Sequence, residues 1–175
     1  MKNEEVASAN GEPVPGASLG GKYMTFKLAA EEYGMEIVKV REIIGMMDVT
    51  RVPKTDGFIR GVINLRGKVI PVVDLRLKLQ MAHAETTDQT VIIVVQYARG
   101  TQDLTMGMVV DEVLEVLSIS ANRIEPPPDL GAGAAHADFL LGVGKADKRV
   151  IFLLDIGKVL EAEDVKRIDG TLVSA

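Results

Sequence analysis

The chain has 175 residues, of which 47% are hydrophobic, and a formal net charge of −5 at pH 7. Its length corresponds to about one domain, and the absence of cysteine excludes disulfides, thiolate metal sites and a cysteine nucleophile. The acidic balance is the opposite of that of most proteins that bind a phosphate backbone. No apolar run approaches the roughly 20 residues of a membrane span, and the acidic start of the chain is unlike a signal peptide. We therefore expect a cytoplasmic protein without direct membrane insertion.

Composition divides the chain into a tail, a folded part and an extension. Residues 1–21 are rich in Gly and Pro and poor in large apolar side chains, so burial cannot offset the entropy of ordering them, and we expect a flexible tail. Residues 22–161 form the folded part, and residues 162–175 form a C-terminal extension. Within the folded part, residues 125–138 hold three consecutive prolines followed by Gly and Ala, which predicts a long irregular loop.

Short strands dominate the folded part. Residues 23–28 alternate between apolar and polar side chains, and residues 69–73, 91–95 and 150–154 are short runs rich in β-branched residues, which predicts strands. Pro71 lacks an amide hydrogen, so its strand is expected at a sheet edge or at a bulge. Residues 37–47 fit either a strand or a helical face, and a helical turn after a strand is one interpretation.

An internal repeat is the most informative feature of the organisation. Residues 34–44 match residues 107–117 at an offset of 73, and residues 58–62 and 69–75 match residues 139–143 and 150–156 at an offset of 81. Each copy then holds about five short strands, which suits a small closed barrel. The sequence therefore predicts a mainly β fold of two small five-stranded barrels side by side, with short helices and a cleft between them. The first barrel is expected at about residues 22–88 and the second at about residues 89–161.

Candidate catalytic groups are few. Asp74 and Asp155 each end an apolar strand before a helix-capable segment, which favours helix capping over catalysis. The glycines around Lys145 lack the spacing and the hydroxyl residue of a phosphate-binding loop. With His83 and His136 as the only histidines, we expect no catalytic site, no metal and no cofactor.

The residues after the first predicted strands instead suggest a protein-binding surface. More aliphatic and methionine side chains cluster there than one small barrel interior can hold: Val40, Ile43, Ile44, Met46 and Met47. Exposed apolar patches bordered by charge are typical of protein interfaces. Nearby, Gly67 favours a tight hairpin turn that presents Arg66.

Four segments closely resemble the CheW-like family of bacterial chemotaxis coupling proteins. They are EEYGMEIVKVREIIG (31–45), GVINLRGKVIPVVDLR (61–76), MGMVVDEVLEVLSI (106–119) and FLLGVGKADKRVIFLLDIGKVL (139–160). The resemblance implies a CheW-like domain over residues 22–161, made of two SH3-like barrels without catalytic activity. It implies an adaptor that couples transmembrane chemoreceptors to the regulatory domain of the histidine kinase CheA, recruited to membrane-associated receptor arrays.

The resemblance also implies two sets of contact residues. The kinase-binding positions match Val40, Glu42, Ile43, Gly61 and Arg66. The receptor-binding positions, in the expected cleft for the receptor's helical tip, are Ile37, Val91, Met106, Gly107 and Val113. We further expect Glu42 and Arg66 to form an ion pair that shapes the kinase-binding surface.

A nucleic-acid-binding barrel is the alternative, because small β-barrels host that function as well. It would require a basic stripe with stacking aromatic side chains. The chain has seven Phe and Tyr residues, no Trp and a net negative charge, so no nucleic-acid partner is expected.

Overall fold

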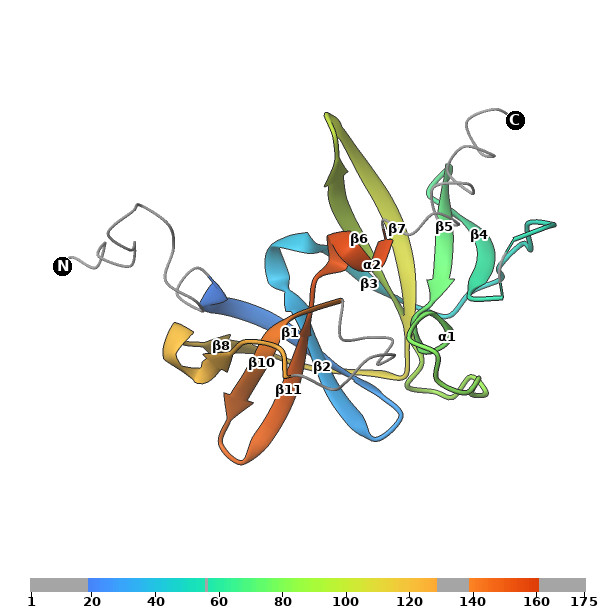
Figure 1. Cartoon of the computed structure of the whole chain (residues 1–175). Helices are drawn as coiled ribbons and strands as arrows, with labels where there is room; N and C mark the ends of the chain where they lie inside the picture. The colour runs from blue at the N-terminus through green and yellow to red at the C-terminus, as the bar shows by residue number, and fades with distance from the viewer. Residues whose placement is uncertain (1–18, 56, 129–138, 161–175) are drawn as a thin grey trace.

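The computed structural model describes residues 19–55, 57–128 and 139–160. The expected tail up to residue 18, most of the expected loop and the C-terminal extension lie outside the described residues. Two β-sheets and four short helical segments make up the described part (Figure 1). The helical segments are η3 (Ile37–Lys39), α1 (Leu75–Lys78), η4 (Ala121–Arg123) and α2 (Ile156–Leu160).

One sheet is built from a continuous stretch of chain, and we call it the contiguous barrel. Its strand order is β3-β6-β7-β5-β4. The strands are β3 (Val40–Gly45), β4 (Ile59–Leu65), β5 (Lys68–Asp74), β6 (Val91–Arg99) and β7 (Gln102–Val110). All neighbours pair antiparallel except β5 and β7, which are parallel.

The other sheet joins both ends of the folded part, and we call it the composite barrel. Its strand order is β8-β1-β2-β11-β10-β9, with β2 and β11 parallel. The strands are β1 (Gly21–Leu28), β2 (Glu31–Glu36), β8 (Glu112–Ile119), β9 (Ile124–Glu125), β10 (Leu140–Ala146) and β11 (Arg149–Leu154). Gly21 already belongs to β1 and Leu19 packs on the composite barrel's core, so the fold begins before the end of the expected tail.

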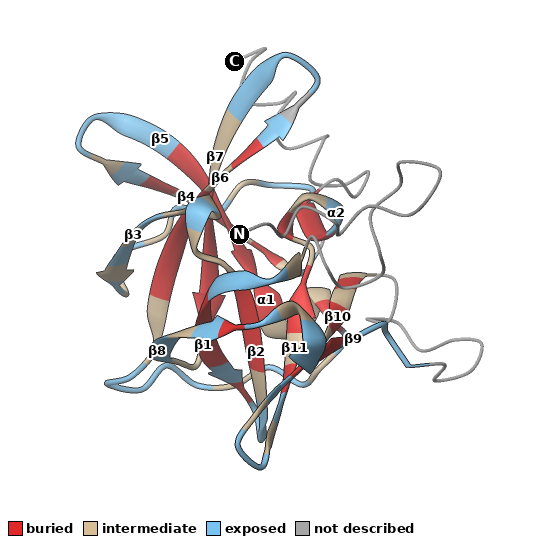
Figure 2. Cartoon of the chain, turned by 90° about the vertical axis from the view of Figure 1, so that its left-hand side faces the viewer, coloured by how far each residue is buried: buried red, intermediate tan, exposed pale blue. Residues whose placement is uncertain are grey.

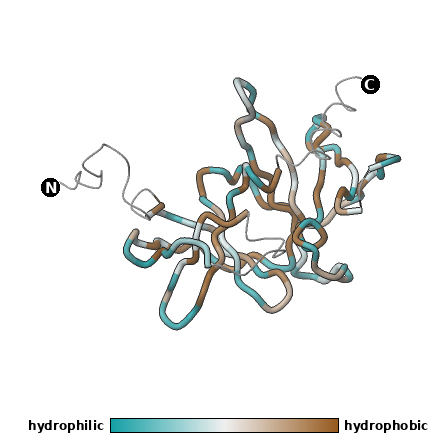
Figure 3. Tube along the Cα trace, in the orientation of Figure 1, coloured by the Kyte–Doolittle hydropathy of each residue, from teal (hydrophilic) through white to brown (hydrophobic). Residues whose placement is uncertain are grey.

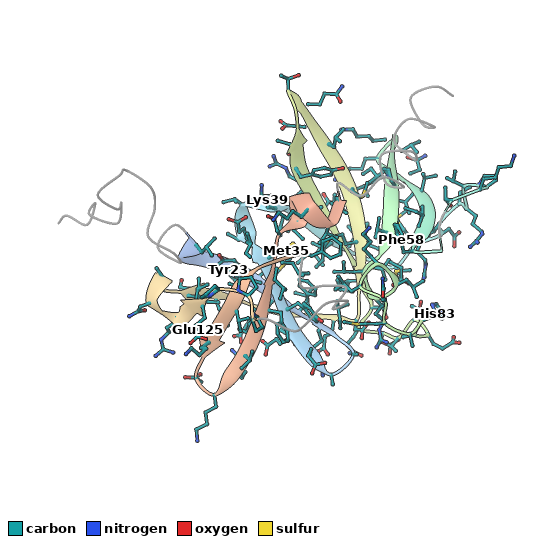
Figure 4. The ribbon with its side chains drawn as sticks, viewed as in Figure 1. Tyr23, Met35, Lys39, Phe58, His83 and Glu125 are labelled. Carbon is teal, nitrogen blue, oxygen red and sulfur yellow. The ribbon has the colours of Figure 1, made fainter. Side chains whose placement is uncertain are left out.

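The apolar strand residues fill three cores. A small cluster lies inside each barrel, and a third, of 20 buried residues, is shared by both sheets and by α1 and α2. Strand β6 explains why several strands are continuously apolar: Ile92 and Val94 face the contiguous barrel's core, while Ile93 and Val95 face the shared core. The buried segments gather where the sheets meet, and the hairpin tips are exposed, with those of β4–β5, β6–β7 and β10–β11 hydrophilic (Figures 2 and 3). Met35 lies at the centre of the molecule (Figure 4).

Strand pairing reproduces the internal repeat. Val72 of β5 pairs in parallel with Gly107 of β7, and Leu153 of β11 pairs in parallel with Gly34 of β2. These partners are related by the offsets of 81 and 73 found in the sequence. Strands β4 and β10 also carry equivalent register shifts, before Gly61 and before Gly142. The prediction of two quasi-equivalent barrels is therefore confirmed.

The sequence predicted that the barrels divide the chain near residue 88, but the structure divides it differently. Strands β1 and β2 precede the contiguous barrel in sequence but complete the sheet of β8–β11, while β6 and β7 complete the sheet of β3–β5. Each copy of the repeat thus contributes its first hairpin to the barrel of the other copy. The sequence identified the repeat but not this exchange, because similarity between copies does not say which copies pair.

Pro71 lies in an inner strand rather than at an edge. Strand β5 runs between β4 and β7, and the register shift lies in β4, not β5. Opposite Pro71, Val62 exchanges both of its backbone hydrogen bonds with Thr50, so Pro71 faces β4 at a pair without ladder bonds. On its other side the pairing with β7 begins one residue later, at Val72. Pro71 therefore lies just before the parallel ladder with β7 begins, which lets a residue without an amide hydrogen occupy an inner strand.

Asp74 and Asp155 cap helices, as predicted. The Oδ1 of Asp74 accepts a hydrogen bond from the amide of Leu77 at 3.3 Å, and the Oδ1 of Asp155 accepts one from Lys158 at 3.2 Å. Their own amides donate to the carbonyls of Phe58 and Phe139, both at 2.7 Å. Both strand-to-helix corners are therefore built alike.

Candidate partner-binding surfaces

The hairpin between β4 and β5 presents Arg66 at its turn. Arg66 and Gly67 both have positive φ, at 53° and 85°, which is the conformation of a two-residue hairpin turn. The Asn64 side chain accepts a hydrogen bond from the Gly67 amide at 2.9 Å. The sequence therefore predicted the turn correctly, and Asn64 adds the contact that stabilises it.

Arg66 and Glu42 form the predicted ion pair. The Arg66 Nη2 donates to the Glu42 Oε1 at 2.5 Å, which joins the hairpin to β3. The hydrogen bond from Arg66 lowers the pKa of Glu42, and the same bond raises the pKa of Arg66. The Arg66 side chain keeps 70% of its surface exposed, so its remaining donors are available to a partner.

Glu42, Ile43 and Arg66 expose side chains along the edge strand β3 and the hairpin that it contacts, and we call this surface the β3 face. Ile43 is 44% exposed and follows Glu42 along β3, so it places an apolar side chain on the opposite side of the strand from the ion pair. The β4–β5 hairpin also exposes Val69, at 54%. Sequence reasoning placed Val69 only in a buried strand, although its position after Lys68 at the start of that strand was a signal for exposure.

The other two predicted kinase-binding residues are less exposed. Val40 is half-buried and packs against the shared core. Gly61 is buried, has a φ of 139°, and leaves no room for a Cβ, which would collide with the carbonyl of Thr50. Gly61 therefore lets the backbone of residues 50–51 pack closely alongside β4 rather than offering a side chain to a partner. The role of these five residues as kinase contacts stays a prediction.

The predicted receptor-binding residues divide into a rim and a buried pair. Ile37, Val91 and Val113 are half-buried and pack against the edge of the shared core, and we call them the receptor rim. Met106 is fully buried inside that core, and Gly107 is buried in β7 against Ile92. The space between the barrels is therefore a packed core at these positions, not the open cleft that the sequence predicted.

Val38 is an exposed apolar residue that the sequence reasoning missed. It lies beside Ile37 in η3 and is 76% exposed. Ile37 and Val38 line a hollow of about 340 Å³ together with Glu36 and the start of β1. The sequence signal for Val38 was its position in the possible helical turn, directly after Ile37 of the predicted receptor-binding residues.

Chemical sites are not evident in the described part of the chain. Among residues 19–55, 57–128 and 139–160, no group of three His, Asp or Glu side chains is placed to hold a metal ion. His83 lies at an outer edge of the molecule (Figure 4). None of the helices described here is long and apolar enough to cross a membrane.

Comparison with known proteins gives one consistent family. The model of the CheW-like domain matches residues 22–164. The chain is 38% identical over 159 residues to the chemotaxis protein CheW of Klebsiella aerogenes, covering 91% of this chain and 93% of that protein. It is 34% identical to the chemotaxis protein CheW of Bacillus subtilis, covering 82% of this chain and 89% of that protein.

A solved structure agrees with these relatives. The scaffolding protein TtCheW from Thermoanaerobacter tengcongensis superposes with a TM-score of 0.73 at 34% identity, covering 83% of this chain and 90% of that chain. The match extends over both barrels and leaves the nucleic-acid alternative unsupported. The chain therefore belongs to the CheW-like domain family.

Proposed function

We propose that this protein is a non-enzymatic adaptor of bacterial chemotaxis that couples chemoreceptors to the histidine kinase CheA. It acts in the cytoplasm and is recruited to membrane-associated receptor arrays. Family membership over residues 22–164 supports this proposal, as do the names of the relatives, which are chemotaxis and scaffolding proteins.

The observation that carries the proposal is the pairing of two different surfaces on one body. The β3 face combines an exposed ion pair with the apolar Ile43, a combination suited to a specific protein contact. The receptor rim offers half-buried aliphatic side chains, which suit the apolar face of a helix. We assign the β3 face to the regulatory domain of CheA and the receptor rim to the cytoplasmic tip of a chemoreceptor.

The mechanism requires no chemistry by the adaptor itself. Holding the kinase and the receptor on one body raises their effective concentration toward each other. If the two partners favour different arrangements of the adaptor, binding energy at one surface biases the other. The preformed Glu42–Arg66 pair reduces the ordering that kinase binding must impose.

Co-sedimentation tests the proposal directly. Receptor-containing membranes are centrifuged with CheA in the presence and absence of this protein. We expect CheA to pellet with the membranes only when the protein is present, and the kinase activity of the pellet to rise. Pelleting of CheA that does not depend on the protein, or failure of the protein itself to pellet, would contradict the proposal.

A further inference from the structure

Within the described residues, the chain crosses between the two barrels at two places. The first crossing is the three-residue turn η3, between β2 and β3. The second is a single residue, Asp111, because β7 ends at Val110 and β8 begins at Glu112. A crossing of one residue transmits any change in the angle between the barrels directly to the strands on both sides.

Asp111 bonds to both barrels at this crossing. Its Oδ2 accepts hydrogen bonds from the Arg76 Nη2 at 2.7 Å and from the Ala29 amide at 2.7 Å. The Arg76 Nε adds contacts of 2.9 Å and 3.1 Å to the two carboxylate oxygens. The amide of Asp111 donates to the carbonyl of Lys27 at 3.1 Å.

The partners of Asp111 come from opposite barrels. Arg76 lies on α1, which follows β5 of the contiguous barrel, whereas Lys27 and Ala29 belong to the β1–β2 hairpin of the composite barrel. Ion pairs elsewhere in the described residues include two that join strands of one sheet: Arg60 with Asp74 in the contiguous barrel and Arg149 with Glu32 in the composite barrel. The Asp111 carboxylate therefore connects elements that the sheets themselves do not connect.

The shared core and Asp111 supply different kinds of constraint. Apolar burial holds the barrels together strongly, but it is non-directional. The bidentate contact with Arg76 has a fixed geometry. We propose that Asp111 is a positioning residue that fixes the angle between the two barrels and, through it, the shape of the receptor rim. The effect on the receptor rim rests on the proposed function.

The receptor rim is the surface most sensitive to that angle. Val91 lies on β6 of the contiguous barrel, while Val113 lies on β8 of the composite barrel, two residues after Asp111. Rotation of one barrel against the other therefore changes the position of Val113 relative to Val91. The β3 face lies entirely on the contiguous barrel and should change little.

Distances between spin labels measure the angle without any partner. The chain has no cysteine, so introduced cysteines are labelled uniquely. Thr101→Cys and Lys148→Cys, at hairpin tips of the contiguous and composite barrels, form the pair between barrels. Thr101→Cys with Lys68→Cys forms a control pair within the contiguous barrel.

Three variants test the role of Asp111 against this background. Asp111→Asn keeps the size of the side chain but removes its charge. Arg76→Gln removes the guanidinium group that binds the Asp111 carboxylate. Glu32→Gln is the matched control, because it removes a partly buried carboxylate whose ion pair lies within the composite barrel.

We expect Asp111→Asn and Arg76→Gln to broaden the distances between barrels and leave the distances within the contiguous barrel unchanged, while Glu32→Gln changes neither. Receptor binding should fall roughly three- to tenfold in the first two variants, with CheA binding within about twofold of the parent. Unchanged distances between barrels would overturn the inference. Broadened distances with unaltered receptor binding would overturn its functional half. Failure of the parent to bind receptors would instead contradict the proposed function, and the distances would still test the angle.

Discussion

At the scale of single residues, exposure separates candidate contacts from structural positions. Glu42, Ile43 and Arg66 reach the surface together, whereas Gly61, Met106 and Gly107 are buried. The sequence motif contains both kinds of residue, because a family pattern preserves the residues that build a surface along with those that touch a partner. The two kinds respond differently to substitution.

The Glu42–Arg66 pair should act as one unit in kinase binding. Glu42→Gln and Arg66→Gln are each expected to weaken CheA binding roughly tenfold, and the double variant should be little weaker than either one, because each single change already breaks the same contact. The melting temperature should hardly change, because an exposed ion pair contributes little to folding. Calorimetric titration with the CheA regulatory domain provides the measurement.

The control for this cycle is the exposed Lys145–Glu125 pair of the composite barrel. Glu125→Gln should leave CheA binding unchanged. Additive losses in the Glu42 and Arg66 variants would show that the two charges contact the kinase independently.

Ile43→Asp should affect CheA binding, whereas Met106→Asp should affect folding stability. Ile43 is 44% exposed and Met106 is 0% exposed. The first substitution should weaken CheA binding with near-parental stability, because the charge remains in water until the partner arrives. The second places a carboxylate in the shared core and should lower the free energy of unfolding by several kcal/mol. Urea unfolding measured beside binding checks this, and a Met106→Asp protein of parental stability would contradict it.

Asp111 should make folding sensitive to acid. Burial raises its pKa, but the hydrogen bonds from Arg76 and the Ala29 amide outweigh burial and lower it below the usual value. A depressed pKa in the folded state stabilises the protein above the unfolded-state pKa of about 4, and this contribution is lost as the pH falls further. Asp111→Asn should therefore flatten the loss of stability between about pH 5 and pH 3.

Urea unfolding over that pH range measures the effect. Asp103→Asn, which changes an exposed carboxylate on β7, is the control and should retain the parental slope. Parallel curves for Asp111→Asn and the parent would contradict the expectation.

At the scale of elements, the local patterns predicted most strands correctly. Residues 91–95 and 150–154 form strands because β-branched residues suit a pleated surface, which is buried on both faces at residues 92–95 and only partly buried in β11, where Val150 is exposed. The ambiguous residues 37–47 became a 3-10 turn followed by β3, which combines the two interpretations. What the pattern could not predict was the burial of Pro71 in an inner strand, because this depends on where the parallel pairing with β7 begins.

Gly61 should be indispensable to its strand. Its positive φ and its contact with Thr50 both exclude a side chain, so Gly61→Ala is expected to lower the free energy of unfolding by about 2 kcal/mol or more. Gly45→Ala is the control, because a Cβ at Gly45 meets nothing within 4 Å. Thermal unfolding compares the two, and equal stability would contradict the role assigned to Gly61.

At the scale of the whole molecule, the sequence revealed the two barrels but not how the chain builds them. The repeat offsets predicted two equivalent units, and the strand pairing agrees. The expected boundary near residue 88 followed from assuming that each copy folds on itself. The hairpins β1–β2 and β6–β7 cross over instead, and the region between the barrels is a joint core rather than a cleft. Neither property is local in the sequence.

This exchange makes the two halves of the chain dependent on each other. A fragment of residues 19–88 holds β1–β5 but lacks the β6 and β7 strands that lie between β3 and β5. A fragment of residues 89–160 lacks the β1 and β2 strands that lie between β8 and β11. Each fragment alone therefore exposes unpaired strand edges and half of the shared core, and neither should fold.

Mixed together, the fragments contain every strand, and they should assemble into a β-rich complex with one cooperative unfolding transition. Circular dichroism and gel filtration of the separate and mixed fragments measure this, with the uncut chain as reference. A cooperative transition in either fragment alone would show that one copy of the repeat can form a barrel by itself, and that the exchange of hairpins is not required for folding.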